Sequence, residues 1–242
     1  MEFITYVSAE GQEFLRLFEL YRSIFGNDDE AEDFEGIQRS YRMVVRPELS
    51  ERFGPFQQYW IEARQDGVSV GGVNFTVFRI DAYDLSSVHI NYIFVSPAQR
   101  GKGIGRELLE KVKEVSCADL FFCEQNSPDR MSPEEIERDL RLSGTSATQR
   151  IRWWLRRGFR VLDMDYIQPP LSEEKRPCTS MTLNVYPWYV RSLSAGLVRE
   201  HLLRFYYLSV FKAGCDLSEV EPYLAPLDGR DWIPTVPCLL TD

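Results

Sequence analysis

Apolar residues recur every three to four positions in several segments of the chain, which is the spacing of one face of an α-helix. Phe14, Leu17 and Tyr21 are the clearest example, within a helix predicted over Gly11–Phe25. The same spacing predicts further helices over residues 36–45, 103–115, 147–157 and 193–211. Short runs rich in β-branched and aromatic residues predict strands over residues 3–7, 57–64, 68–80, 88–95, 120–123, 159–167 and 181–186.

The order of these elements predicts the fold class. One strand and two helices come first, followed by three strands, a helix, a strand, a helix and two strands. Ser127–Gly144 is polar, and we expect an insertion there with one short helix, because Ser132-Pro133-Glu134-Glu135 is a helix-start signature. A helical segment follows the last strand, and the tail after Gly214 reads as loop-rich. This order is typical of a mixed α/β arrangement on one sheet with a C-terminal helical extension.

Composition narrows the classes of partner. Hydrophobic residues make up 44% of the 242-residue chain, which is enough for a substantial core and argues against disorder. The formal charge of −9 disfavours a nucleic-acid partner, because neutralising phosphates requires a basic surface. The same charge is compatible with a cationic substrate. The five cysteines form no C-x-x-C pair and only two histidines are present, so we expect no metal site and no disulfide framework.

The ends and the hydropathy of the chain predict its compartment. The first residues, Met1–Tyr6, lack the basic and apolar regions of a signal peptide. No apolar run approaches the roughly 18–20 residues that span a bilayer. We therefore expect a cytoplasmic protein that does not enter a membrane.

The most informative segment is a strand that leads through a glycine-rich turn directly into a helix. The strand ends at Val95-Ser96-Pro97, and Gly101, Gly103 and Gly105 precede the helical pattern. Glycines allow positive φ angles and close approach of a ligand to the backbone. The first N–H groups of a helix lack internal partners and lie at the positive end of its dipole. Such a turn is an anion site that suits a pyrophosphate.

Neighbouring residues and spacing refine this interpretation. Arg100, Lys102 and Arg106 add positive charge in a chain that is otherwise acidic. The spacing lacks the Gly-Lys-Ser/Thr of a Walker A loop. It gives G-x-G-x-G rather than the G-x-G-x-x-G of a dinucleotide-binding turn. A glycine turn without any ligand is the remaining alternative.

The segment Val95–Gly105 resembles the acyl-CoA motif of the GNAT acetyltransferases, R-x-x-G-x-G/A after a strand that ends in V-x-P. Arg100, Gly103 and Gly105 fall on the three defining positions. Leu155-Arg156-Arg157-Gly158-Phe159 also resembles the helix-to-strand ending of many members.

The extent of the resemblance predicts the domains. The element order agrees with the family over residues 1–187, where we expect the acyl-CoA-binding domain, and residues 188–242 lie outside it as a C-terminal extension. The extension could cover the acceptor site, form a dimer surface or enlarge the core. The chain is expected to be a monomer or a homodimer.

The resemblance implies a fold, a cosubstrate and a set of contacts. The fold is a mainly antiparallel mixed sheet flanked by helices, with central strands that splay apart, and the cosubstrate is acetyl-CoA without a metal. The backbone of Ile93, Phe94 and Val95 would pair with the pantetheine arm. The pyrophosphate would face the amides of Arg100, Gly101, Lys102, Gly103, Ile104 and Gly105, with Arg106 adding charge. The splayed strand would be Leu120–Asn126, where Asn126 binds the pantetheine or caps the next segment.

Two side chains depart from the family pattern. Many members carry a glutamate four residues before the strand-ending valine, where this chain has Asn91, which cannot act as a base. Many carry a tyrosine as general acid four residues before Gly158, where this chain has Trp154. The asparagine that usually precedes that tyrosine by seven residues is Ala147 here.

Other carboxylates and hydroxyls are therefore candidates for the chemistry. Glu124, at the end of the splayed strand, is the predicted base, against the alternative of a solvated strand-end carboxylate. Asp163 and Asp165 would share one face of a strand, either binding an amine or facing solvent. Tyr166 is a possible acid or a packed aromatic. Cys123 is a weak candidate for an acyl carrier, because it lies within an apolar run.

These residues lead to two functional hypotheses. The first is an N-acetyltransferase that moves an acetyl group from acetyl-CoA to a primary amine of a small molecule by direct attack. The second is an acyl-CoA-binding sensor that has the fold without the chemistry. A longer acyl donor or a peptide acceptor is a further option. A cationic acceptor could be recognised by Asp29, Glu30 or Asp33, or these acids could simply mark an exposed helix start.

Overall fold

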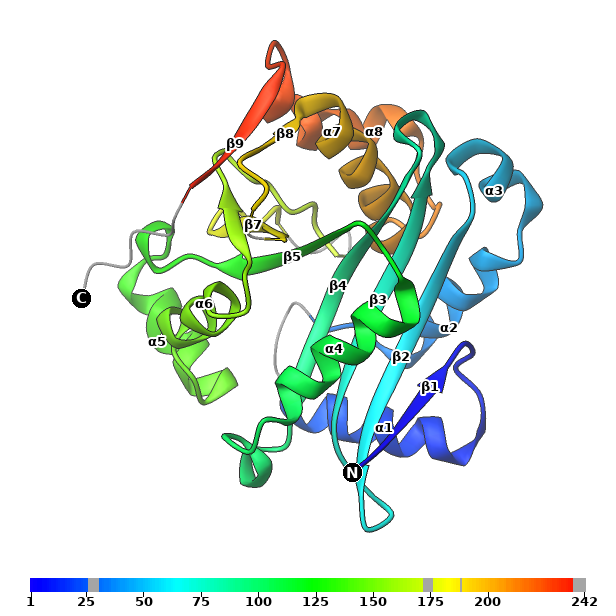
Figure 1. Ribbon diagram of the computed structural model, residues 1–242, viewed down its shortest axis with the longest axis vertical. Helices are drawn as coiled ribbons and strands as arrows, with labels where there is room; N and C mark the ends of the chain where they lie inside the picture. Colours follow the sequence, from blue (N-terminus) through cyan, green and yellow to red (C-terminus); the bar gives the residue numbers. More distant parts are fainter. Residues whose placement is uncertain (26–30, 172–175, 188, 237–242) are drawn as a thin grey trace. The chain divides into compact units, whose positions relative to one another are not determined.

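The computed structural model describes residues 1–25, 31–171, 176–187 and 189–236. The chain divides into two compact units, Met1–Asp119 and Leu120–Asp242. Figure 1 shows the helices and strands of both, and each unit is described by itself.

The first unit contains a four-stranded antiparallel sheet. Its order is β1-β2-β3-β4, the strands being β1 (Glu2–Tyr6), β2 (Phe56–Gln65), β3 (Val68–Ile80) and β4 (Leu85–Val95). Strands β2 and β3 form the predicted hairpin. Their two-residue turn, Asp66-Gly67, has positive φ at both positions, 51° and 78°, which matches the right-handed twist of a hairpin.

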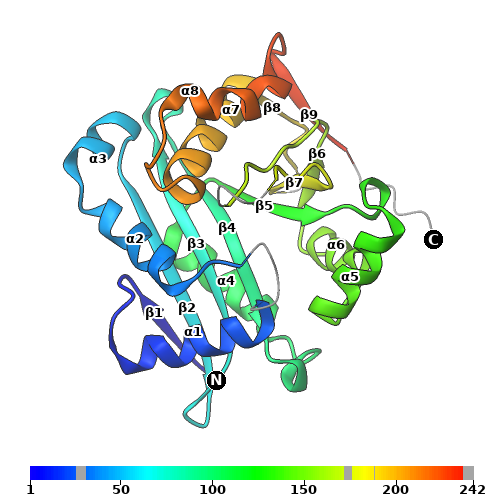
Figure 2. The ribbon, with the colours of Figure 1, turned by 180° about the vertical axis from the view of Figure 1, so that it is seen from behind.

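Helices cover both faces of this sheet (Figures 1 and 2). On one face lie α1 (Gly11–Phe25) and α2 (Phe34–Val44), whose buried residues pack with Trp60 and Phe94 in one core cluster. On the other face lies α4 (Ile104–Ser116), which buries Ile104, Leu108, Leu109 and Val112. A short helix that the pattern did not predict, α3 (Pro47–Phe53), starts with proline in its first turn.

A β-bulge interrupts the pairing of β3 with β4. Asn74 pairs with Tyr92 and the next residue, Phe75, pairs with Ile90, so Asn91 is an extra residue on β4. A bulge bends its strand and lets two successive side chains turn to the same face. Asn91 bonds to Asn74 and Thr76, while the Tyr92 ring contacts the ring of Tyr21 on that same face.

The second unit contains five strands in the order β5-β7-β6-β9-β8, and every described pairing is antiparallel. They are β5 (Leu120–Asn126), β6 (Arg160–Leu162), β7 (Met181–Tyr186), β8 (Ser192–Ser194) and β9 (Trp232–Val236). The helices are α5 (Pro133–Ser143), α6 (Ala147–Leu155), α7 (Ala195–Arg204) and α8 (Leu217–Leu224), with a π-helical segment over Phe205–Val210. Short 3₁₀ turns lie at Asp81–Tyr83, Pro97–Gln99, Pro128–Arg130 and Ala225–Leu227.

The fold class and most elements are confirmed. The fold is mixed α/β, with mainly antiparallel strands flanked by helices. The predicted helix start at Ser132 is a complete capping box, in which Ser132 and Glu135 bond reciprocally to each other's backbone N–H. The expected splay concerns β4 and β5, which belong to different units, and stays a prediction.

Two predictions about the second half of the chain are wrong, and a third, the helix over residues 193–211, holds to within two residues at its start. The strand predicted over residues 159–167 is only β6, because tight bonds from Met164 N to Leu162 O and from Tyr166 N to Met164 O replace sheet pairing. The helix predicted over residues 193–211 begins at Ala195, after β8. The tail contains α8 and β9, and β9 pairs with β6. The domain boundary at residue 187 stays a prediction.

Candidate active site

The glycine turn of the first unit has the backbone conformation that glycine permits. Gly101 and Gly103 have φ angles of 79° and 90°, in the left-handed region that other residues rarely adopt. A Cβ atom added at Gly101 would meet nothing within 4 Å, and at Gly103 only the ends of the Glu107 and Arg106 side chains, at 3.8 and 3.9 Å. The turn therefore leaves room for a group to approach the backbone.

The backbone N–H groups of this turn have no partner within the described parts of the chain. Helix α4 begins after Gly103, which has no side-chain cap, and its first internal bonds are donated by Arg106 and Glu107 to the carbonyl of Gly103. No acceptor in the described ranges receives the N–H groups of residues 101–105. Five successive donors at the positive end of a helix form an anion site.

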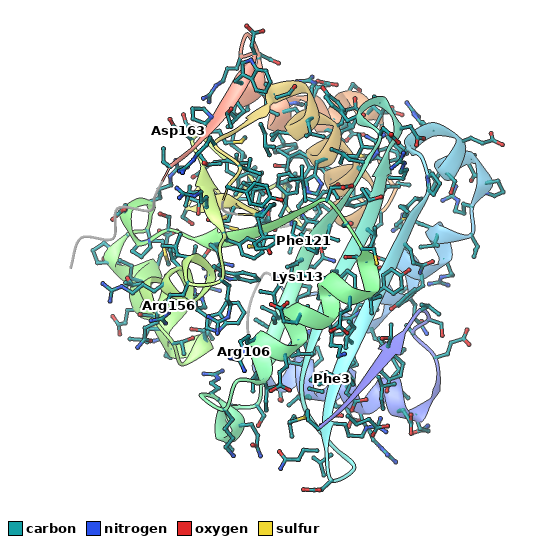
Figure 3. All side chains as sticks on the ribbon, in the orientation of Figure 1. Phe3, Arg106, Lys113, Phe121, Arg156 and Asp163 are labelled. Atoms are coloured by element: carbon teal, nitrogen blue, oxygen red, sulfur yellow. The ribbon has the colours of Figure 1, made fainter. Side chains whose placement is uncertain are left out.

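Basic side chains surround the turn. Arg106 stands at the start of α4 (Figure 3), and its guanidinium lies beside Gly103. Lys102 Nζ bonds to Gln99 Oε1 at 2.7 Å, and Arg100 Nε bonds to the carbonyl of Val95 at 3.3 Å. The Arg100 contact ties the turn to the end of β4. The residues present would fit a pyrophosphate, and their assignment as its site stays a prediction.

The end of β4 presents backbone groups on two sides. Ser96 N donates to Val70 O of β3 at 2.9 Å. Because N–H groups alternate along a strand, Phe94 also faces β3, whereas Ile93 and Val95 turn their N–H groups away from it. Ile93 and Val95 are thus the two residues of the predicted set whose amides can meet a ligand along this strand.

Glycines of β3 allow β4 to lie close at this point. A Cβ atom at Gly71 would come within 2.7 Å of Phe94 O, and one at Gly72 within 2.8 Å of the Phe94 ring and 2.9 Å of Leu17. The Phe94 carbonyl belongs to the backbone and cannot move aside as a flexible side chain can. A side chain at position 71 would therefore clash with β4.

In the second unit, Glu124 has both carboxylate oxygens engaged. The Tyr166 hydroxyl donates to Oε1, and Gln168 Nε2 donates to Oε2 at 2.9 Å. Glu124 is half-buried, whereas Tyr166 and Gln168 are buried. Donors on both oxygens fix the orientation of the carboxylate. Burial, followed by the charge of Glu124, raises the pKa of Tyr166 well above its ordinary value, so this hydroxyl keeps its proton and acts as a donor.

The segment that carries these two donors is itself held in place. The Tyr206 hydroxyl donates to Ile167 O at 2.8 Å, and Gln168 exchanges two backbone bonds of 2.9 Å with Cys178. Tyr166 and Gln168 are two residues apart, and both side chains donate to the Glu124 carboxylate. Gln168 was not predicted from the sequence, and the i, i+2 spacing of two polar side chains is the signal that was available.

Other predicted residues have structural roles. Asn126 Nδ2 donates to Asp139 Oδ1 at 3.1 Å, and the Arg150 guanidinium binds the same carboxylate oxygen, so Asn126 ties β5 to α5. Trp154 is buried and packs edge-on against Trp153 and Phe159, which is the role of a core residue.

The remaining carboxylates and the cysteine are also placed. Asp163 and Asp165 are both exposed, which agrees with a solvated face although they lie outside a strand. Cys123 is buried, and this burial raises the pKa of its thiol well above the ordinary value, which disfavours the thiolate that an acyl carrier needs. Asp33 accepts a bond from Gly36 N at 2.7 Å and caps α2. Asp29 and Glu30 lie outside the described residues.

Two wider searches of the structure complete this description. Within residues 1–25, 31–171, 176–187 and 189–236, no three or more His, Cys, Asp or Glu side chains are grouped to bind a metal ion. In the same ranges, no helix combines the length and apolar character needed to cross a bilayer.

Comparison with known proteins agrees with this geometry. The model of the "Acetyltransferase (GNAT) family" matches residues 14–122, which include the glycine turn. No curated protein matches the sequence significantly.

Solved structures give matches at low identity. A protein described as a GNAT-family acetyltransferase from Bacteroides thetaiotaomicron is 21% identical, with a TM-score of 0.56, covering 87% of this chain and 99% of its own. One from Desulfovibrio desulfuricans is 14% identical, with a TM-score of 0.47, covering 77% and 99%. An aminoglycoside 6′-N-acetyltransferase complexed with coenzyme A is 11% identical, with a TM-score of 0.47, covering 79% and 99%. At these identities the likeness concerns the fold.

Proposed function

Because residues 14–122 match the model of the GNAT acetyltransferase family, we propose that this chain is an acyltransferase that moves the acetyl group of acetyl-CoA to a primary amine of a small molecule. The observation that carries the proposal is the row of N–H groups at residues 101–105, which find no acceptor among the described residues and fit the pyrophosphate of CoA. Arg106 and Lys102 supply the compensating positive charge. Ile93 and Val95 hold the pantetheine arm through their backbone.

The reaction requires a neutral amine. A typical alkylamine has a pKa near 10, so at neutral pH a proton must leave before nitrogen attacks the thioester. We assign the acceptance of this proton, directly or through a water molecule, to Glu124. Its carboxylate is oriented by hydrogen bonds from Tyr166 and Gln168, which supports this role. Asn91 and Trp154, at the positions where the family carries its base and acid, cannot exchange a proton.

The thioester carbonyl gains negative charge as the amine attacks. A backbone N–H that faces the ligand stabilises this charge without reorganisation. The backbone N–H of Val95 or of Ile93 can donate to this oxygen, because both N–H groups point away from β3. The new C–N bond forms as the C–S bond breaks and CoA leaves as the thiolate. The nitrogen releases its second proton as the amide forms, and the thiolate takes up a proton through solvent, so the step balances.

The acceptor class is proposed from charge. A chain of formal charge −9 favours a cationic amine over an anionic one. We expect the protein to act as a monomer or homodimer in the cytoplasm.

The test is the release of free thiol from acetyl-CoA by the purified chain, against polyamines, aminoglycosides, amino acids and short peptides. Release that depends on one amine class supports the transferase and names its acceptor. Binding of acetyl-CoA without release across the panel supports the alternative, an acyl-CoA-binding sensor, which the absence of a titratable side chain at Asn91 and Trp154 would then explain.

A further inference from the structure

One face of the sheet in the first unit changes from aromatic to polar along its strands. Trp60 and Phe94 belong to the aromatic cluster beneath α1 and α2. Further along the same face lie buried polar side chains, namely Gln58, Asn74, Thr76 and His89. Burying polar groups is costly unless each finds a hydrogen-bond partner, so such a row needs an explanation.

A hydrogen-bond relay fixes the orientation of Asn91 within this row. Asn74 Nδ2 donates to the backbone carbonyl of Tyr59 at 2.9 Å, which leaves Asn74 Oδ1 as an acceptor. Asn91 Nδ2 donates to that oxygen at 2.8 Å. A backbone carbonyl can only accept, so the relay has one direction, and neither amide can flip without losing bonds.

The relay leaves one acceptor without a donor. Asn91 Oδ1 is buried and has no hydrogen-bond partner in the part of the chain that the structure describes. An unpaired buried carbonyl oxygen is unfavourable in the free protein. The bulge that inserts Asn91 into β4 aims this side chain, and bulges often occur where a strand re-aims a residue at a site.

The surroundings of this oxygen favour a cationic donor. The adjacent residue on the bulge, Tyr92, is half-buried, and its ring lies 5.0 Å from that of Tyr21 and 5.5 Å from that of Phe25. Aromatic faces attract ammonium groups. Asn91 also lies four strand residues, about 13 Å, before Val95, where the turn for the pyrophosphate begins. An extended pantetheine arm along β4 spans such a length.

We propose that Asn91 Oδ1 binds the acceptor amine, accepting a hydrogen bond from one of its N–H groups. This inference rests on the proposed function and adds a binding residue for its substrate. An amide oxygen takes no proton, so Asn91 holds the nitrogen while another group accepts the proton. At the position where many family members carry a glutamate base, this chain thus has Asn91 as a residue that binds the acceptor amine.

The test measures binding, so that it does not depend on turnover. The full chain, saturated with CoA, is titrated calorimetrically with spermidine and with kanamycin, and the dissociation constants are compared with those of Asn91→Leu. We expect about tenfold weaker amine binding in the variant, the effect of losing one bond to a charged donor, with the affinity for CoA unchanged within twofold. Gln57→Leu, which removes an amide bonded only to the Gln58 carbonyl, is the matched control and should bind both amines normally.

A second variant separates binding from folding. Asn74→Leu keeps Asn91 Oδ1 but removes the partner that orients it, so amine binding should weaken about threefold. If Asn91→Leu binds both amines as tightly as the wild-type protein does, the partner of Asn91 Oδ1 is a water molecule and the inference is overturned. A protein that binds an amine through Asn91 but releases no thiol would contradict the transferase and leave the inference standing.

Discussion

The hydroxyl of Tyr166 donates a hydrogen bond to Oε1 of Glu124, and this contact links a buried phenol to a half-buried carboxylate. Gln168 completes the arrangement at Oε2. These two bonds orient the carboxylate that we propose as the acceptor of the substrate's proton. This contact, the glycine turn and the buried carboxylate of Glu62 each lead to a testable prediction.

Replacing Glu124 with glutamine tests the proton acceptor. Glu124→Gln keeps the shape of the side chain but removes its basicity, so kcat should fall by about two orders of magnitude, within the usual range for a general base. The affinity for acetyl-CoA should stay within twofold. Asp165→Asn, which neutralises a fully solvated carboxylate of the same unit, is the control and should keep wild-type kcat. An unchanged rate in Glu124→Gln would remove this residue from the mechanism.

Removing the Tyr166 hydroxyl tests the orientation of Glu124. Tyr166→Phe loses one bond to a charged acceptor, and we expect kcat to fall by about tenfold at neutral pH, with little change in the acetyl-CoA dissociation constant. Tyr41→Phe removes a buried hydroxyl that bonds a backbone carbonyl in the first unit, so it controls for the loss of stability alone. Equal rates in both variants would mean that Tyr166 is only a packing residue.

The glycine turn makes a direct prediction about cosubstrate binding. Gly103→Glu places bulk and negative charge where the pyrophosphate is proposed to lie, so acetyl-CoA binding should be lost in calorimetry. Gly229 has a similar positive φ of 70° and open space around it, so Gly229→Glu introduces the same backbone strain elsewhere. The control should retain wild-type affinity. Retained affinity in Gly103→Glu would contradict the assignment of the turn.

Stability should depend on pH through Glu62. Burial alone raises the pKa of this carboxyl, but bonds from Arg64, Ser69 and Tyr6 outweigh burial and hold it below the ordinary value of 4.5. A folded pKa below the unfolded one gives stability that is present above pH 4.5 and is lost as pH falls through the folded pKa. Glu62→Gln should lower the free energy of unfolding at pH 7 by about 2 kcal/mol.

The same variant should flatten the pH dependence below pH 4.5, measured by denaturant unfolding at several pH values. A Glu62→Gln protein whose stability falls with acid as steeply as that of wild type would show that other carboxyls dominate.

Local chemistry made much of the first unit predictable. The Asp66-Gly67 turn and the glycine turn are specified by residues that tolerate positive φ, and the start of α2 is capped by Asp33. The left-handed Gly103 where α4 begins follows the same logic, and the anion site proposed there stays a prediction.

Elements that depend on distant partners were not predictable. The three-residue strands β6 and β8 both pair with β9, which comes about 75 residues after β6 and about 40 after β8, and β6 also pairs with β7. Gln168 joined the candidate site only through its bond to Glu124 across 44 residues. Asn91 appeared in the sequence as a lost base, and only the relay through Asn74 showed which of its atoms is available.

The most direct test of the account follows the acetyl group itself. Wild-type protein is given acetyl-CoA with a ¹³C-labelled acetyl group together with the amine that supports thiol release, and the products are identified by mass spectrometry. The account predicts one labelled acetyl group on the amine for each thiol released. Label that stays in acetyl-CoA bound to the protein, or appears only as acetate, would contradict amine acetylation.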